Sequence, residues 1–143
     1  MSIQEPSTRS SYDDYVRERE AARRELVGMT YFVTSNWLTA LLWRLFLGRK
    51  RIPIRRIRVF RVNDCDWVAA RTSDEAVKWY CLSTGLPRDE AIEEYLLQEC
   101  DLKKVAFYRD EYRAGEPNCS LKDLIREHAN GILFPQVIAS TEY

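Results

Sequence analysis

The fold is decided by residues 57–70, which read Ile57-Arg58-Val59-Phe60-Arg61-Val62-Asn63-Asp64-Cys65-Asp66-Trp67-Val68-Ala69-Ala70. The first six residues are rich in β-branched and aromatic side chains and predict a strand. Residues 63–66 have the composition of a turn, because Asn and Asp tolerate unusual backbone angles. Residues 67–70 begin a returning strand, so the stretch predicts a β-hairpin.

Two helices are expected after this hairpin. Thr72 and Glu75 match a capping box, in which each side chain bonds the other residue's backbone N–H, and the helix that they open ends at Gly85. Pro87 suits the first position of another short helix. The apolar face of that helix would carry Ala91, Ile92, Tyr95 and Leu96.

Strand and helix signals continue to Tyr143. Residues 104–109 and 134–140 have strand patterns, and Ser120 is the expected N-cap of a helix between them. The order predicts an α+β fold, with a small antiparallel or mixed sheet of about four strands packed by helices. We expect residues 57–143 to form this compact core.

Residues 1–56 are expected to form a helical extension that is both basic and apolar. A charged helix is predicted from about residue 12 to 27, then a short extended stretch, then an apolar helix that ends before Gly48. The apolar run 37–47 is too short for a transmembrane helix, which needs about 20 largely apolar residues. Because such a helix must be buried, it predicts an oligomer interface that includes Trp37, Leu41, Trp43, Leu45 and Phe46.

Charge divides the chain into two halves. Residues 1–62 hold 13 Lys or Arg and 6 Asp or Glu, whereas the remaining residues hold 9 and 16, which gives +7 and −7. Residues 26–63 contain no acid at all, and this basic segment carries Arg44, Arg49, Lys50, Arg51, Arg55, Arg56, Arg58 and Arg61. The segment is a candidate site for a protein partner, for nucleic acid or for a membrane surface.

The acidic half supplies a second set of candidate binding residues. These lie in the turn of the hairpin and on the helix expected after Pro87, and they are Asn63, Asp64, Asp66, Asp89, Glu90, Glu93 and Glu94. An acidic face suits a protein partner whose own surface is built to bind nucleic acid. We therefore expect recognition of a cationic protein surface.

No complete catalytic or metal-binding set is visible. The four cysteines form no CxxC pair, His128 is the only histidine, and the glycines are isolated. Asp64, Asp66 and Asp74 could hold Mg²⁺, but turn formation and the dipole of a helix already explain them. The sequence predicts no catalytic residue, no metal and no cofactor.

Residues 59–70 also carry a family likeness. Together with Tyr80, Thr84-Gly85-Leu86 and the ending Ile138-Ala139-Ser140-Thr141-Glu142-Tyr143, they resemble small proteins of bacteriophages and mobile elements. The core of that family opens with F-R-V-N-D-x-D-W-x-A-A and ends with A-S-T-E-Y. The resemblance covers residues 57–143 and implies an accessory protein of a phage or mobile element.

These observations lead to one expected function and one alternative. We expect a non-enzymatic protein that acts by protein–protein binding in the cytoplasm of a bacterial host, as an inhibitor of a CRISPR-type defence complex. Homo-oligomer formation through residues 37–47 is also expected. The alternative is a nucleic-acid-binding module that uses the basic segment from Arg49 to Arg61.

Overall fold

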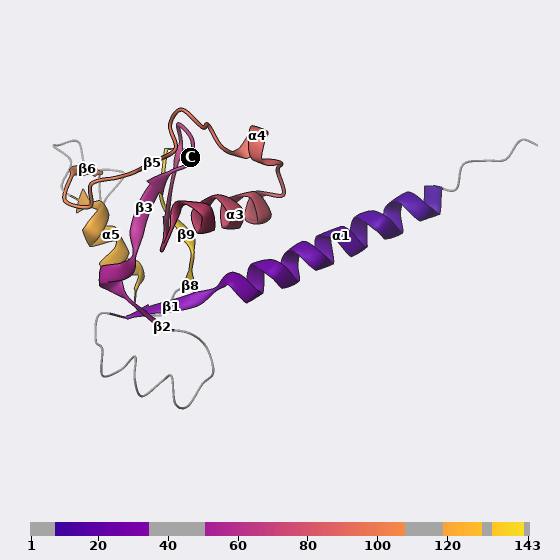
Figure 1. Ribbon diagram of the computed structural model, residues 1–143, viewed down its shortest axis with the longest axis horizontal. Coiled ribbons are helices and arrows are strands. Elements are labelled where there is room, and N and C mark those ends of the chain that lie inside the picture. The colour runs from indigo at the N-terminus through magenta and orange to yellow at the C-terminus, as the bar shows by residue number, and fades with distance from the viewer. Residues whose placement is uncertain (1–7, 35–50, 108–118, 130–132, 142–143) are drawn as a thin grey trace, which may run out of the picture.

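The computed structural model describes residues 8–34, 51–107, 119–129 and 133–141. Its elements are, in chain order, α1 (Thr8–Met29), β1 (Tyr31–Thr34), β2 (Arg51–Pro53), the 3-10 helix η1 (Ile54–Arg56), β3 (Arg58–Arg61), β4 (Asp66–Ala70), α3 (Ser73–Thr84), α4 (Arg88–Ala91), β5 (Gln98–Glu99), β6 (Val105–Phe107), β7 (Cys119–Ser120), α5 (Leu121–His128), β8 (Leu133–Phe134) and β9 (Gln136–Ser140). The chain has the predicted α+β architecture, with helices packed on small sheets (Figure 1).

The predicted hairpin is confirmed and forms the middle of the larger sheet. β3 and β4 are antiparallel, with Val59 opposite Ala69 and Phe60 opposite Val68. β5 pairs with the outer edge of β3, and β9 pairs with β4, so that the sheet has the antiparallel order β5-β3-β4-β9. The sequence does not predict β5, which consists of two exposed residues.

Hydrophobic clusters lie on both faces of this sheet, because successive side chains of a strand point to opposite sides. Val59 packs in a cluster with residues of α5, β1, β2 and β8. Phe60, its neighbour in the chain, packs in a second cluster with residues of α3 and with Ala91 and Ile92. The sheet is therefore a middle layer between α3 on one side and α5 with the smaller sheet on the other.

The smaller sheet brings the N-terminal residues into the core. β1 pairs in parallel with β2 and antiparallel with β8. Tyr31 and Val33 are each 2% exposed and belong to the same cluster as Ile57, as does Ile52. The boundary between an extension 1–56 and a core 57–143 stays a prediction, but residues from both sides share one hydrophobic cluster.

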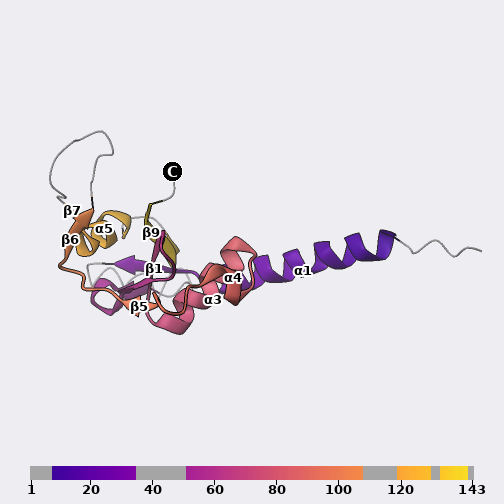
Figure 2. The ribbon, with the colours of Figure 1, turned by 90° about the horizontal axis from the view of Figure 1, so that it is seen from above.

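α1 projects away from the rest of the described protein in both views (Figures 1 and 2). It spans Thr8–Met29, beyond both ends of the helix predicted at 12–27. Its C-terminal part meets α3, where Glu25 forms an ion pair with Lys78 at 2.5 Å. Tyr12 and Tyr15, nearer its N-terminus, are exposed. Within the described residues, no helix is both long and apolar enough to cross a membrane.

The predicted length of the helix after Pro87 is wrong. α4 covers only Arg88–Ala91, and Pro87 precedes it as the N-cap residue. Ile92 is extended and buried, and the N–H of Glu93 donates to the carbonyl of Val62 at 2.9 Å. Pairing with the strand region therefore ends the helix before Tyr95, which is 83% exposed rather than on a buried face.

The capping predictions are confirmed in part. The Thr72 hydroxyl accepts from the N–H of Glu75 at 3.2 Å, and Gly85 ends α3 in the left-handed conformation. The predicted bond in the other direction, from the N–H of Thr72 to the Glu75 side chain, is wrong. The Glu75 carboxylate accepts from the N–H of Arg71 instead. Ser120 caps α5 as predicted, and Asp123 completes a capping box there.

The predicted C-terminal strand 134–140 is divided at Pro135 into β8 and β9, which join different sheets. Of the predicted strand 104–109, the structure assigns residues 105–107 to β6. The apolar helix that ends before Gly48 lies outside the described residues. So do all of its predicted oligomer-interface residues, Trp37, Leu41, Trp43, Leu45 and Phe46.

Candidate functional site

The turn between β3 and β4 is built around the side chain of Asn63. Its Oδ1 accepts from the N–H groups of Cys65 at 2.9 Å and Asp66 at 2.7 Å, as expected for an Asn that shapes a turn. Its Nδ2 donates to the hydroxyl of Tyr80 at 3.0 Å, and that hydroxyl donates to the Asp66 carboxylate. Asn63 and Asp66 thus fasten the turn to α3, and Asp64 is the exposed member of the three.

The same turn is fastened to the segment that follows α4. Asn63 Nδ2 also donates to the carbonyl of Ala91 at 3.4 Å, and Glu93 is tied by its N–H to Val62. These contacts hold the segment that carries Tyr95 beside the turn, where the charges of Asp64 and Arg61 have small and opposite effects on the pKa of Tyr95. The structure therefore brings the two predicted acidic groups together at one end of the molecule.

Tyr95 is the most exposed large hydrophobic residue at this end, at 83%. Its hydroxyl donates to Glu93 Oε2 at 2.6 Å. This hydrogen bond to Glu93, with the negative charge of Glu93, raises the pKa of Tyr95 above its usual value. We call the surface made of Asp64, Asp89, Glu90, Glu93, Glu94 and Tyr95 the Tyr95 surface.

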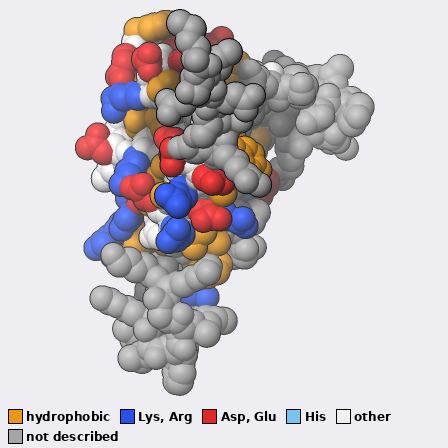
Figure 3. All heavy atoms as spheres, turned by 90° about the vertical axis from the view of Figure 1, so that its right-hand side faces the viewer, with side chains coloured by type: hydrophobic (Ala, Val, Ile, Leu, Met, Phe, Trp, Pro, Cys, Tyr) orange, Lys and Arg blue, Asp and Glu red, His pale blue; other side chains and the backbone are white. Residues whose placement is uncertain are grey.

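The charges of the Tyr95 surface are only partly neutralised. Arg88 Nε lies 2.6 Å from Glu94 Oε1, and this bond lowers the pKa of Glu94. Asp89 and Glu90 lie in the first turn of α4 and form no ion pair with any other described residue. Figure 3 shows acidic side chains at the end of the molecule that carries α4, and others further along the same face among Lys and Arg. The surface thus combines an exposed aromatic ring with acidic residues, of which Glu93 bonds the ring hydroxyl and Asp64 acts on it by its charge, as does the cation Arg61.

Described residues of the basic segment do not form a continuous cationic ribbon. Arg58 lies 3.5 Å from Glu99, and Arg61 donates to the carbonyls of Asn63 and Asp64. Arg51 lies over the ring of Phe32, with 5.2 Å between the guanidinium carbon and the ring centre. The remaining described members, Arg55 and Arg56, are exposed, whereas Arg44, Arg49 and Lys50 lie outside the described residues.

Nothing in the described part of the chain assembles a metal site from three or more His, Cys, Asp or Glu. The four cysteines are free thiols, and partial burial raises the pKa of Cys81 and Cys100. His128 Nδ1 lies 2.7 Å from the carbonyl of Leu124, so Nδ1 carries the proton and donates it within α5.

Tyr95 is the candidate binding residue that the sequence misplaces. Helical spacing puts it on a buried face with Ala91 and Ile92, whereas the chain has already left the helix at Ile92. The signal that could have found it is the run of acids from Asp89 to Glu94, since a ring beside so many charges is poorly suited to a core.

Comparison with protein-family models, with curated proteins and with solved structures finds no significant match for this chain. The likeness to phage and mobile-element proteins therefore stays a prediction. The candidate site rests on the geometry described above.

Proposed function

We propose that this protein is a non-enzymatic binding module whose Tyr95 surface docks on a cationic surface of another protein. The observation that carries the proposal is the exposure of Tyr95, at 83%, beside the carboxylates of Glu93 and Asp64. Tyrosine is enriched among the residues that dominate binding energy at protein interfaces. Surrounding acids would select a basic partner and speed its association.

The resemblance to phage and mobile-element proteins supports a more specific form of this proposal. The partner would be a bacterial defence complex of the CRISPR type, and binding would block its nucleic-acid-binding surface without any chemical step. A surface that binds nucleic acid is rich in Lys and Arg. The Tyr95 surface would present carboxylates to such a site, where nucleic acid would present its phosphates.

Affinity purification from the bacterial host, with and without nuclease, tests the proposal. We expect a protein partner to co-purify even after nuclease treatment. The Tyr95→Ala variant should no longer co-purify with that partner. Tyr12→Ala is the matched control, because Tyr12 is also exposed, at 68%, but lies on α1. Equal retention of the partner by both variants would exclude the Tyr95 surface.

A second set of variants tests the charges. Glu90→Gln, Glu93→Gln and Glu94→Gln together should weaken partner binding and reduce its dependence on salt, because screened attraction between charged surfaces is removed. Asp13→Gln with Asp14→Gln and Glu18→Gln removes three acids from α1 and serves as the control. Unchanged binding by the first triple variant would contradict the proposal.

The second candidate function is nucleic-acid binding by the basic segment, which the exposure of Arg55 and Arg56 favours. This alternative predicts affinity that falls with salt, with a log–log slope of roughly 0.7 to 0.9 for each phosphate contact. Retention on DNA or RNA that vanishes in Arg55→Glu with Arg56→Glu would support it. The absence of any retention at low salt would exclude it.

A further inference from the structure

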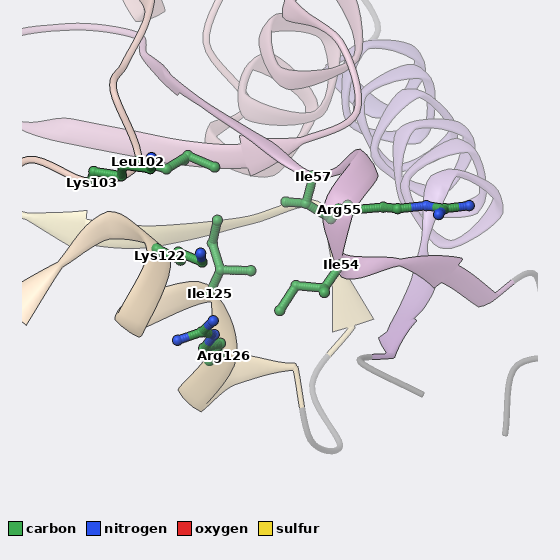
Figure 4. Close-up of a pocket in the computed structure, with 8 residues that line it drawn as sticks. All are labelled: Ile54, Arg55, Ile57, Leu102, Lys103, Lys122, Ile125 and Arg126. Carbon is green, nitrogen blue, oxygen red and sulfur yellow. The ribbon is translucent and has the colours of Figure 1, made fainter. Parts of the chain in front are cut away.

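A hollow of about 390 Å³ opens between η1, the chain before β6, and α5. Apolar side chains form its floor: Ile54, Ile57, Leu102 and Ile125. Figure 4 shows these four side chains converging on the same space from three segments of the chain. Ile57 and Ile125 are buried in the cluster that includes β1 and β8, so the floor is part of the core.

A backbone hydrogen bond joins two of the walls, α5 and the chain before β6. The N–H of Lys122, in the first turn of α5, donates to the carbonyl of Leu102 at 3.0 Å. η1 forms the third wall and is continuous with β3 through the buried Ile57. Two walls are therefore helical elements, η1 and α5, and the other is a turn bonded to α5, so the hollow exists before any ligand binds, as is usual for ligand sites.

The rim of the hollow is entirely cationic. Its remaining lining residues are Arg55, Lys103, Lys122 and Arg126, of which Arg55 directs its guanidinium away from the hollow (Figure 4). None of the four forms an ion pair with a residue that the structure describes, and the lining contains no acid. Lys122 and Arg126 are four residues apart on α5 and lie on one face, where like charges repel.

From this arrangement we propose that the hollow binds a small amphipathic anion, with an apolar body on the isoleucines and a phosphate or carboxylate at the rim. An apolar floor with a few convergent polar groups is the usual composition of a small-molecule site, and about 300 to 1,000 Å³ is its usual size. The body would displace water from the floor, and the anion would relieve the repulsion among the cations.

Both parts of such a ligand are needed to satisfy the site. Inorganic phosphate would meet the cations but leave the floor in contact with water. A neutral apolar molecule would fill the hollow but leave the cations at its rim, Lys122 and Arg126 among them, without a bound anion. The Tyr95 surface contributes no residue to the hollow, so this inference stands apart from the proposed protein binding.

Titration calorimetry with 1-naphthyl phosphate tests the inference on the full chain. We expect saturable binding with one ligand per protein, and much weaker binding of inorganic phosphate and of 1-naphthol. Lys122→Glu with Arg126→Glu should weaken binding by at least about tenfold, because attraction becomes repulsion. Arg19→Glu with Arg23→Glu is the matched control, with the same charge change at the same spacing on α1.

Filling the hollow gives a second, independent measurement. Ile54→Trp places a larger apolar side chain at the partly buried edge of the floor and should prevent binding while the thermal midpoint is retained. Equal loss of affinity in the α5 and α1 double variants would overturn the inference, as would binding of inorganic phosphate as tight as that of 1-naphthyl phosphate. An absence of saturation at millimolar ligand would overturn it as well.

Discussion

Tyr31 links β1 to the start of α3 through its hydroxyl. The ring is 2% exposed, and the hydroxyl donates to Glu75 Oε2 at 3.1 Å. The same carboxylate accepts from Arg71 through both its backbone and its guanidinium, which also lies 4.8 Å from the centre of the Tyr31 ring. This network attaches the N-terminal strand to the helix that covers the other face of the central sheet.

Tyr31→Phe is predicted to lower the free energy of unfolding by about 1 kcal/mol, the typical net value of one hydrogen bond. The loss is small because Arg71 still satisfies Glu75 and the ring still fills its place in the core. Urea denaturation measures the change. Tyr12→Phe, on exposed α1, should leave stability unchanged, and a similar loss in both variants would contradict the assigned role.

The hydroxyl of Tyr31 also predicts a dependence of stability on pH. Burial, followed by the negative charge of Glu75, raises the pKa of Tyr31 well above its ordinary value of 10.0. Because the folded state favours the neutral phenol, its contribution is complete below pH 10 and is lost as the pH rises further. Unfolding free energies measured from pH 8 to 11 should therefore fall more steeply for the native chain than for Tyr31→Phe.

At the scale of the element, α3 depends on Gly85 for its C-terminus. Gly85 has φ of 71° and its N–H donates to the carbonyl of Cys81 at 3.0 Å. A Cβ at this position would meet no atom within 4 Å, so the only cost of a larger residue is that of the left-handed backbone.

Gly85→Ala is accordingly predicted to destabilise the protein by about 1 kcal/mol. Gly28→Ala is the control and should change stability in the opposite direction. Gly28 lies within α1 and has open space around it, and Ala has the higher helix propensity. Thermal denaturation of both variants measures the contrast. A stable Gly85→Ala protein, or a destabilised Gly28→Ala protein, would refute this account of the two glycines.

The elements that the sequence predicts well are those with local causes. The hairpin follows from strand patterns on both sides of Asn63, and α3 follows from Thr72 at one end and Gly85 at the other. The helix after Pro87 fails because Glu93 pairs with Val62, and this partner is 31 residues away in the chain. The spacing of apolar residues along the chain carries no information about a hydrogen bond to a residue that is far away in the sequence.

The candidate sites also divide into one whose residues are close in the sequence and one whose residues are not. The acids around Tyr95 are visible in the sequence because most of them are neighbours in the chain. The cations of the hollow come from three separate segments, around Arg55, Lys103 and Lys122, and no spacing rule connects them. Their grouping depends on α5 packing against η1 and on the backbone bond from Lys122 to Leu102.

At the scale of the whole molecule, the two charged halves are joined by a shared core. β1 and β2, from the positive half, form one sheet with β8 from the negative half. Their buried residues pack in one cluster with those of β3 and α5. The N-terminal half of α1, by contrast, carries mostly exposed side chains and extends beyond this core.

Truncation distinguishes these two roles of the N-terminal residues. A chain that begins at residue 21 keeps the Glu25–Lys78 ion pair and all of β1, so its thermal midpoint should stay within a few degrees of that of the full chain. A chain that begins at residue 57 loses the buried side chains of Tyr31, Val33 and Ile52. At about 2 kcal/mol for each buried side chain, this loss is comparable to the whole stability of a small domain.

We therefore expect the chain that begins at residue 57 to lack a cooperative thermal transition and dispersed amide resonances. A cooperative transition in that chain would show that residues 57–143 fold alone and that β1 and β2 only cover them. A large fall in the midpoint of the chain that begins at residue 21 would show instead that the exposed part of α1 stabilises the core. Circular dichroism and amide NMR spectra of the three chains separate these outcomes, because they report helix loss and tertiary packing independently.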